Sequence, residues 1–255
     1  MLLRLHTHRL KIDNLYPKLK NSLLYSFKNE AELIKSINEL TDLFNFKRND
    51  LSQYVDNKRL VSAYVMYFLS TNYKKLERFF RFIPDELKAE LLKTELVDWG
   101  TGPGTFLLAA KKLGFENCIG IDQSNLMITQ AKRILKELKL DDGVKFSLTE
   151  KSRSRTLLFS HSANEMETKE VQSVIQKVDP EFVLFIEPGT KESFRKIIEI
   201  RSDLLGSYSV LYPCPSNSEC PMMNQNNDWC HQVVQVTHED KICLLYTSPS
   251  PRDRG

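Results

Sequence analysis

A buried strand that runs into alternating glycines is the feature that most constrains this chain. The apolar run Leu96-Val-Asp98 predicts the strand, Gly100, Gly102 and Gly104 follow it, and a predicted helix begins at Thr105. Glycines permit a tight turn and let a ligand approach the backbone, and the helix N-terminus offers unpaired N–H groups. This strand, loop and helix therefore predict a site for a cofactor that carries an adenosine.

A second acid supports this prediction. Asp122 ends the next predicted strand, and a carboxylate at that place accepts ribose hydroxyls in dinucleotide-binding folds. A dinucleotide loop would need glycine at position 105, which is Thr105. The pattern Asp-x-Gly-x-Gly-x-Gly instead resembles the S-adenosylmethionine loop of class I methyltransferases. That resemblance implies that Asp98 lies near the methionine amino group and that Asp122 holds the ribose. The alternative is a glycine-rich turn without a ligand.

Strands and helices alternate after the first strand. We expect strands at 118–122, 144–148, 156–160, 182–187 and 208–212, and helices at 105–112, 125–138, 165–178 and 191–205. Alternation at this pitch predicts an α/β fold with a doubly wound, parallel, Rossmann-like sheet. Residues 1–93 are predicted to be helical instead, and the cysteine-bearing segment is expected as an insertion near the end of the sheet.

Charge is distributed unevenly along the chain. Residues 1–93 carry 17 Lys and Arg against 11 Asp and Glu, whereas the remainder carries 19 against 22. The helical third, with the run Lys74, Lys75, Arg78 and Arg81, is therefore expected to meet phosphate, although an ordinary solvated helix surface is the alternative. No apolar stretch is long enough to predict a membrane span. The basic start of the chain, with no acid before Asp13, is compatible with an organelle-targeting peptide or with a helix start.

Three cysteines lie together in a proline-rich segment. Cys214, Cys220 and Cys230 are separated by five and nine residues, which is not the spacing of a zinc ribbon. Thiolates are soft ligands, so an iron–sulfur cluster and zinc are both open, as are three unliganded buried cysteines. A cluster held by three cysteines needs a fourth ligand. His231 is a poor one because it is adjacent to Cys230, and Cys243 is a possible one.

No residue is predicted to be catalytic. Methyltransferases that act on a base amine usually carry Asn or Asp, two prolines and an aromatic residue after the fourth strand. The corresponding stretch here is His161-Ser-Ala-Asn-Glu-Met166. Asn164 and Glu165 are expected to contact a ligand or to be ordinary polar residues at a strand end. Cys118 lies in an apolar strand and is expected in the core.

These motifs together resemble one known family. The aromatic and basic helix from Tyr54 to Phe80, the loop DWGTGPGT, the strand VLFIEPGT and the pattern PCP-x4-CP followed by WCH resemble the mitochondrial small-ribosomal-subunit assembly proteins of the methyltransferase-like 17 type, also called ribosomal small subunit of mitochondria 22, and their bacterial relatives. The resemblance implies a class I methyltransferase fold, bound S-adenosylmethionine, a 4Fe–4S cluster and contact with the small ribosomal subunit through its rRNA. Cys214, Cys220 and Cys230 match the first three cluster ligands, and the fourth is expected beyond the end of this chain.

Two functions follow as expectations. The first is a ribosome-assembly factor that supports translation, and the alternative is an active rRNA or protein methyltransferase. We expect a helical N-terminal region at 1–93, a methyltransferase-like domain at 94–212, a cysteine-rich segment and sheet end at 213–243, and a non-native or disordered tail at 244–255. The protein is expected to be a mitochondrial monomer, with the bacterial cytoplasm as the alternative compartment.

Overall fold

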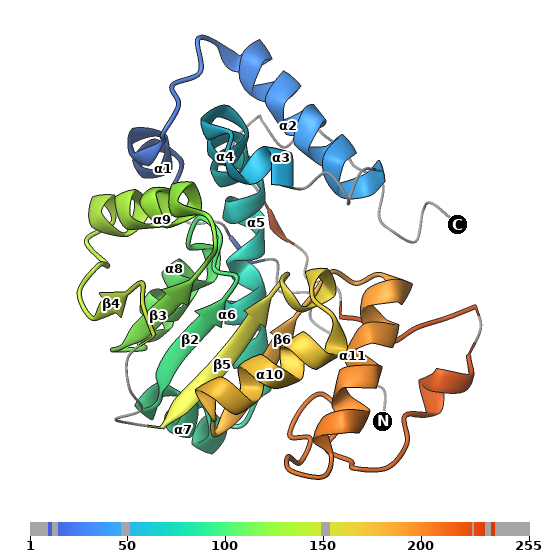
Figure 1. Ribbon diagram of the computed structural model, residues 1–255. Helices are drawn as coiled ribbons and strands as arrows, with labels where there is room; N and C mark the ends of the chain where they lie inside the picture. The colour runs from blue at the N-terminus through green and yellow to red at the C-terminus, as the bar shows by residue number, and fades with distance from the viewer. Residues whose placement is uncertain are drawn as a thin grey trace.

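The central element is a five-stranded parallel sheet with strand order β4-β3-β2-β5-β6. The computed structural model describes residues 10–11, 15–46, 52–148, 154–225, 227–232 and 236–237. The strands are β2 (Glu95–Trp99), β3 (Cys118–Ile121), β4 (Val144–Lys145), β5 (Arg155–Ser160) and β6 (Phe182–Ile186). The first strand of the sheet is central and the chain winds outward from it in both directions (Figure 1). This doubly wound order confirms the predicted Rossmann-like, methyltransferase-like α/β sheet.

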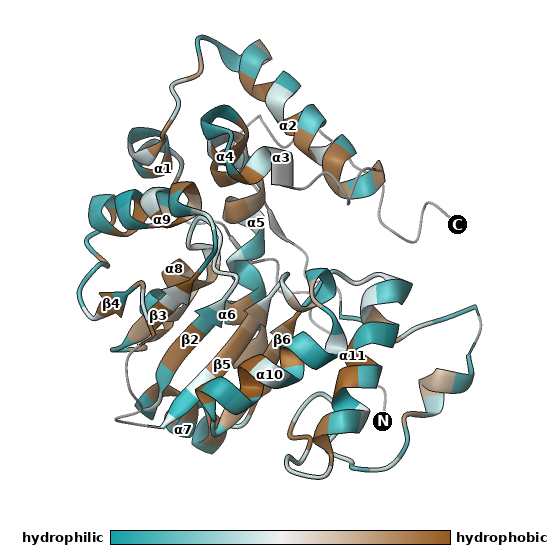
Figure 2. Ribbon diagram, viewed as in Figure 1, coloured by the Kyte–Doolittle hydropathy of each residue, from teal (hydrophilic) through white to brown (hydrophobic). Residues whose placement is uncertain are grey.

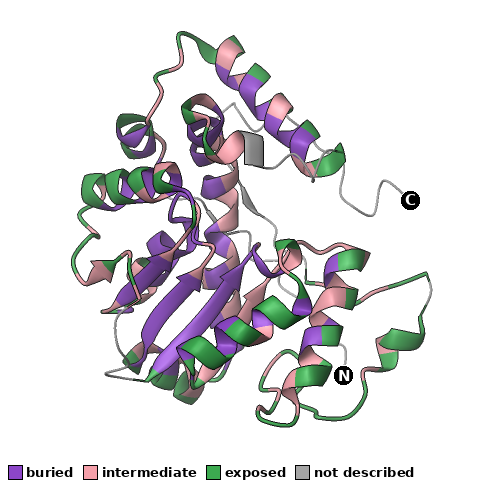
Figure 3. Cartoon of the chain, viewed as in Figure 1, coloured by how far each residue is buried: buried purple, intermediate pink, exposed green. Residues whose placement is uncertain are grey.

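Alternate side chains of the strands form separate cores on the two faces of the sheet. On one face, Leu96 and Leu158 pack against α8 (Thr105–Leu113) and the N-terminal helices. On the other face, Val97 and Leu157 pack against α10 (Thr168–Val178). Figure 3 shows β2 and β5 as the most deeply buried strands. The ends of these two strands, between which the winding direction changes, are where a doubly wound sheet binds its ligands.

The first of the N-terminal helices lie over the carboxyl ends of the strands, and the last of them lies at the amino ends (Figure 1). They are α1 (Tyr16–Ser22), α2 (Glu30–Phe46), α3 (Ser52–Val55), α4 (Lys58–Tyr64), the π-helix η2 (Val65–Leu69), α5 (Ser70–Asn72), α6 (Lys74–Phe82) and α7 (Asp85–Lys93). Figure 2 shows apolar and polar residues alternating along α2, whose inward side carries buried Leu33, Ile37 and Leu40. An amphipathic helix of this kind is stabilised mainly by packing of its apolar face.

The remaining elements follow the sheet order. They are α9 (Asn125–Glu137), the 3-10 helix η3 (Ala163–Glu165), α11 (Lys191–Leu204), the 3-10 helix η4 (Pro221–Asn224) and a two-residue parallel pairing of β1 (Leu10–Lys11) with β7 (Val236–Thr237). The helix predicted from residue 165 begins only at Thr168, because Glu167 and Glu170 form a capping box there. None of the helices in the described part of the chain combines the length and the apolar character needed to cross a bilayer.

The sixth predicted strand, at 208–212, is absent from the described structure, and the prediction is wrong. The Val210 backbone N–H donates to Asn217 Oδ1 at 3.1 Å instead of to β6. The Tyr208 hydroxyl donates to the Pro180 carbonyl at 3.0 Å, and Leu211 is 53% exposed. Side-chain hydrogen bonds therefore take the place of strand pairing, and Pro213 ends any extended pairing immediately afterwards. Predicted strand 144–148 is also shorter, since β4 pairs over two residues only.

Candidate ligand site at the carboxyl edge of the sheet

The glycine loop follows β2 and curls over the end of β3. Gly100, Gly102 and Gly104 have φ values of 77°, 53° and 84°, the left-handed region that favours glycine. The N–H groups of Gly100 and Thr101 donate to the Ile121 carbonyl at 2.8 and 2.9 Å. Gly104 then begins α8 without a side-chain cap, so the first turn of α8 keeps N–H groups for a ligand.

The three glycines differ in what surrounds them. A β-carbon on Gly100 would lie 2.5 Å from Ser162 Cβ, and one on Gly104 would lie 2.9 Å from Ala131 Cβ. These two glycines are therefore required for packing within the protein. A β-carbon on Gly102 would meet no atom within 4 Å. Open space beside a left-handed loop glycine fits a cofactor that approaches the backbone at this point.

Asp122 is positioned by the loop that it faces. Its Oδ2 atom accepts from the Gly102 N–H and its Oδ1 atom from the Ser124 N–H, both at 2.8 Å. A carboxylate has about four acceptor positions, so these two bonds leave capacity for ribose hydroxyls. The structure thus brings together Gly102 and Asp122, two of the residues predicted to bind the cofactor.

Asp98 lies beneath the loop and is fully buried. Its carboxylate accepts from Ser160 Oγ at 2.6 Å and from Thr101 Oγ1 at 2.7 Å. Burial raises the pKa of Asp98 to about 6, although both hydrogen bonds oppose the shift. Asp98 therefore joins the loop to β5 from below.

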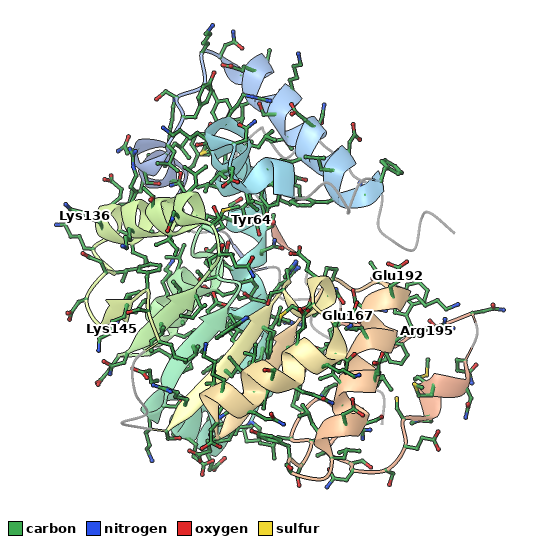
Figure 4. The ribbon with its side chains drawn as sticks, viewed as in Figure 1. Tyr64, Lys136, Lys145, Glu167, Glu192 and Arg195 are labelled. Carbon is green, nitrogen blue, oxygen red and sulfur yellow. The ribbon has the colours of Figure 1, made fainter. Side chains whose placement is uncertain are left out.

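Two tyrosines from the N-terminal helices lie across from this loop. The rings of Tyr54 and Tyr64 are stacked with centroids 6.4 Å apart, and Tyr64 stacks on Phe68 at 5.5 Å. Ser124 Oγ donates to the Val55 carbonyl at 3.0 Å, which ties α3 to the start of α9 beside Asp122. We call Tyr54, Tyr64 and Phe68 the aromatic wall. Figure 4 shows Tyr64 between the N-terminal helices and the sheet.

An unpartnered buried hydroxyl marks the space near this wall. Thr105, the first residue of α8, is 2% exposed, and its Oγ1 atom lacks a hydrogen-bond partner. The Tyr64 hydroxyl lies near Thr105 and Asn72, but the Thr105 contact does not meet hydrogen-bond geometry. A buried polar atom without a partner costs free energy, so a ligand that pairs with Thr105 would be stabilised here.

A cluster of half-buried ionisable groups at the ends of β5 and β6 was not predicted from the sequence. Lys75 Nζ lies 2.8 Å from His161 Nε2, and His161 has a left-handed φ of 60°. Burial lowers the pKa of Lys75 to about 8 and, together with Lys75, holds the pKa of His161 well below its usual range. Burial raises the pKa of Glu187 to about 8. Shifts of this size at a strand edge are typical of functional sites.

The position of Lys75 corrects one sequence prediction. Lys74 is 4% exposed and pairs with Glu77 at 2.8 Å, while half-buried Lys75 is directed toward His161. The guanidinium of Arg78 lies 4.1 Å from the centre of the Phe82 ring, and Arg81 is exposed. The run of four basic residues is therefore not a continuous phosphate-binding surface, because its first two members face inward.

The cysteine segment is attached beside Glu187. Trp229 Nε1 donates to the Gly189 carbonyl at 2.9 Å, and His231 lies against Gly189. Nearer the start of the segment, Arg201 of α11 donates to the carbonyls of Ser216 and Ser218 at 2.6 and 2.8 Å. The segment therefore lies over the end of β6 and along α11. A hollow of about 530 Å³ lies between α11 and η4, lined in part by Arg195 and Met223.

The three predicted metal ligands lie in one neighbourhood without forming a ready-made site. Cys214, Cys220 and Cys230 are all free thiols. Partial burial, and then the nearby Cys214 and Cys220, raise the pKa of Cys230. Nowhere in the described residues do three His, Cys, Asp or Glu side chains lie close enough together to hold a metal ion. The soft donor set fits a cluster or zinc in chemistry; Cys243 lies outside the described residues.

Solved methyltransferases are among the proteins similar to this chain. An S-adenosylmethionine-dependent methyltransferase from Clostridium acetobutylicum ATCC 824 is 16% identical with a TM-score of 0.37, covering 59% of this chain and 62% of the other. Magnesium protoporphyrin IX methyltransferase from Synechocystis PCC 6803 is 18% identical with a TM-score of 0.37, covering 66% of this chain and 85% of the other. The chain thus spans less than two thirds of the first of these proteins. No curated protein sequence matches it.

One family model matches most of the chain. The model, described as mitochondrial small ribosomal subunit Rsm22, matches residues 58–246. The match begins with α4, continues through the sheet and includes the glycine loop and all three cysteines of the segment. It covers more than half of the sequence. The chain belongs to the mitochondrial small ribosomal subunit Rsm22 family.

Proposed function

We propose that this protein is an assembly factor of the mitochondrial small ribosomal subunit, in which a methyltransferase-like fold binds S-adenosylmethionine, an iron–sulfur cluster and rRNA. The observation that carries the cofactor proposal is the open space beside Gly102, whose N–H bonds to Asp122. The family description supports the ribosomal and mitochondrial parts of the proposal. The proposed regions are the helical N-terminal region at 1–93, the methyltransferase-like domain at 94–212 and the cysteine segment at 213–243.

In the proposed site, the ligand lies between the glycine loop and the aromatic wall. Asp122 accepts the ribose hydroxyls, and Gly100, Gly102 and Gly104 carry the backbone that the cofactor approaches. Asp98 acts on the methionine amino group through its charge, because its two oxygens already accept from Ser160 and Thr101. The chain supplies N–H groups and carboxylates, the donors and acceptors that an adenosine and an amino acid need.

The cysteine segment is the proposed cluster-binding element. Cys214, Cys220 and Cys230 would be the ligands, with zinc as the rival metal. Three free thiols within one short segment are chemically suited to an iron–sulfur cluster, because the irons of such clusters are held by cysteine thiolates. The bond between Trp229 and Gly189 holds the segment at the sheet edge. Binding of the cluster is therefore proposed to order the segment there rather than to create a separate domain.

The proposed rRNA-binding surface lies on α9 and β4. Arg133, Lys136 and Lys139 are exposed at α9, and Lys145 is exposed on β4. Figure 4 shows Lys136 and Lys145 on the same side of the molecule, directed away from its body. Basic side chains grouped on one surface bind phosphates without reading base sequence. This surface replaces the inward-facing Lys74 and Lys75.

A second candidate function is methyl transfer to rRNA or protein. Lys75, His161 and Glu187 favour it, because acid–base groups with shifted pKa values lie at the edge where a ligand would bind. Transfer of the methyl group from sulfonium to an acceptor leaves a neutral thioether, and the acceptor releases one proton. Neutral Lys75, whose pKa is lowered to about 8 and which lies 2.8 Å from His161 Nε2, is the group that would accept this proton.

One experiment separates the two functions. The protein is incubated with methyl-labelled S-adenosylmethionine and small ribosomal subunits, which are then sedimented and counted. The assembly-factor proposal expects the protein in the subunit fraction and no label in rRNA or protein. Label in an acceptor that disappears in Lys75→Ala would establish methyl transfer. Absence of the protein from the subunit fraction at low salt would exclude the assembly-factor proposal.

A further inference from the structure

The surface on α9 and β4 continues onto the first helix of the chain. Asn21 Nδ2 of α1 donates to Glu137 Oε1 of α9 at 3.2 Å. The side chain of buried Gln130 donates to the Ser22 carbonyl at 2.9 Å and accepts from the Leu24 N–H at 3.0 Å. Figure 1 shows α1 beside α9, with β4 on the other side of α9. These hydrogen bonds hold α1 and α9 together, so the two helices and β4 present one continuous surface.

The exposed charges on this surface are mostly positive. Residues 16–22 and 125–145 carry seven exposed Lys and Arg side chains and three exposed Asp and Glu side chains. On α10 and α11, which cover the other face of the sheet, three exposed basic side chains are outnumbered by four exposed acidic ones. We call the seven exposed basic side chains of residues 16–22 and 125–145 the basic platform. Its charge is complementary to a polyanion, and that of the opposite face is not.

The basic platform is broad as well as charged. Lys132, Arg133 and Lys136 share the solvent side of α9, because Ile134 and Leu135 occupy the buried side. The 13 residues of α9 extend over about 20 Å. Further lysines lie on α1 and β4, to either side of this helix. Charges distributed over such an area reach phosphates on both strands of a duplex.

The basic platform lacks the rings that bind unpaired bases. No aromatic side chain of residues 16–22 or 125–145 is exposed. The neighbouring Phe146 ring is half-buried, and Lys132 Nζ lies 5.3 Å from its centre. The exposed aromatic side chains of the described residues are Phe46 and Phe82, at the ends of α2 and α6. Single-stranded RNA is bound largely by stacking of its bases on aromatic rings, which this surface does not offer.

Paired RNA requires a different set of contacts. An A-form helix has a wide, shallow minor groove, and proteins bind it through its phosphates and 2′-hydroxyls rather than through its base edges. Lysine and arginine side chains supply the donors for such contacts, and contacts to phosphate carry no information on base sequence. The basic platform offers these donors without exposed rings, so its chemistry matches a duplex backbone.

We infer that the basic platform binds the sugar–phosphate backbone of double-stranded RNA without regard to base sequence. The inference rests on the proposed binding of rRNA and names the form of RNA that is bound. It also adds Lys18 and Lys20 of α1 to the surface on α9 and β4. A protein that binds RNA in this way recognises a stem only after its base pairs have formed.

The test measures binding of the full chain to three RNAs by fluorescence anisotropy. They are a duplex of about 16 base pairs, the span of a typical double-strand-binding module, a second duplex with the base pairs in a different order, and a single strand that does not pair with itself. The two duplexes should bind with affinities within about twofold of each other. The single strand should bind at least about tenfold more weakly, because each lost phosphate contact costs up to about eightfold at 0.1 M salt.

The matched variants remove two charges each. Lys18→Gln combined with Lys20→Gln should weaken binding of the duplexes by about tenfold or more, since two phosphate contacts are lost. Lys169→Gln combined with Lys177→Gln removes the same charge from α10 and should leave the affinity unchanged. All four lysines are exposed, so both variants should fold, and equal midpoints of thermal unfolding check this.

Each contrary result has its own meaning. Binding of the single strand as tight as that of the duplexes overturns the inference and leaves rRNA binding in place. A preference above about tenfold between the duplexes would show readout of base edges and overturns recognition through the backbone. Equal weakening by both double variants, or none by the Lys18 and Lys20 variant, overturns the assignment of α1 to the surface. No binding of any RNA at low salt overturns the inference and the proposed rRNA binding together.

Discussion

The backbone N–H of Gly102 donates to the Oδ2 atom of Asp122 over 2.8 Å. This bond joins the loop after β2 to the end of β3, so the backbone turn and the carboxylate have a fixed relative position. Gly102 and Asp122 are both half-buried. A ligand that reaches one of them also reaches the other, and a substitution at Gly102 is therefore expected to affect the whole site.

Gly102→Val is expected to abolish binding of S-adenosylmethionine, because the added side chain occupies the open space beside the loop. Gly114→Val is the matched control, since Gly114 also has a positive φ and no atom within 4 Å of its added β-carbon, but lies at the other end of α8. Gly114→Val carries the greater backbone strain, because its φ of 105° lies farther outside the left-handed region than the 53° of Gly102. Calorimetry should show loss of binding in Gly102→Val alone, and equal losses in both variants would attribute the effect to strain.

Asp98→Asn is expected to stabilise the protein at pH 8 and much less at pH 4. The pKa of Asp98 is raised to about 6 in the folded state, above about 3.9 for an unperturbed carboxyl. Wild-type stability therefore falls as pH rises from about 4 to about 6 and then stays constant. Removing the charge should add about 1–3 kcal/mol to the free energy of unfolding at pH 8. Urea unfolding at both pH values measures this difference, and an equal gain at both would contradict the buried charge.

Removing the exposed charges of Arg133, Lys136 and Lys145 should weaken the salt dependence of rRNA binding. Each lost phosphate contact lowers the slope of log K against log salt by about 0.7–0.9, so the triple glutamine variant should lose about 2. Filter binding over a range of salt concentrations measures the slope.

The matched control for that surface lies on the opposite side of the sheet. Lys169, Lys177 and Arg195 are also exposed, and their triple glutamine variant changes the net charge by the same amount. Its slope should remain that of wild type. If both triple variants reduce the slope equally, the rRNA contact follows net charge and not the surface on α9 and β4.

Cys220→Ser is expected to prevent assembly of an iron–sulfur cluster, while Cys118→Ala should allow it. Cys118 is buried in β3 and far from the segment in sequence, so it controls for general loss of a thiol. Anaerobic reconstitution with iron and sulfide should give wild type a brown colour and bound sulfide. A colourless protein that retains one zinc ion per chain, also lost in Cys220→Ser, would establish zinc as the metal.

Trp229→Phe should loosen the cysteine segment without unfolding the sheet. The substitution removes the indole N–H that donates to the Gly189 carbonyl, at a cost of about 1 kcal/mol. Limited proteolysis should cut within residues 213–232 faster in the variant, while the midpoint of thermal unfolding stays within about 3 °C of wild type. Unchanged proteolysis would show that the bond from Trp229 does not hold the segment in place.

The parts of the site that follow from local sequence were predicted correctly. The glycine loop, β2 and β3 depend on neighbouring residues, and the apolar runs that end at Asp98 and Asp122 identify their strand ends. Their direct contact with a ligand stays a prediction. The prediction of a strand at 208–212 was wrong although the apolar pattern there is typical of a strand. Its hydrogen bonds go to Asn217 and Pro180. Hydrophobic periodicity does not predict hydrogen-bond partners outside the segment.

The aromatic wall and the position of half-buried Lys75 depend on tertiary packing. Tyr54 and Tyr64 have the spacing of ordinary helix-core residues, and the hydrogen bond from Ser124 to Val55 helps to place them over the sheet. Lys75 belongs to a basic run that reads as a solvated surface, yet it lies against His161. The sequence shows a group of aromatic residues before the sheet and a histidine directly after a strand. Neither pattern predicts which helix or strand these side chains contact in the folded protein.

The π-helix Val65–Leu69 determines how these two features can belong to one continuous helical stretch. A π turn contains one residue more than the corresponding α-helical turn, and one residue corresponds to a rotation of about 100°. The extra residue therefore sets the rotational phase of α6 relative to α4. Deleting a single residue from this turn would turn Lys75 away from His161 while leaving Tyr64 in position. The stretch works as two helices with separate orientations, so its sequence tolerates substitution more readily than a change in length.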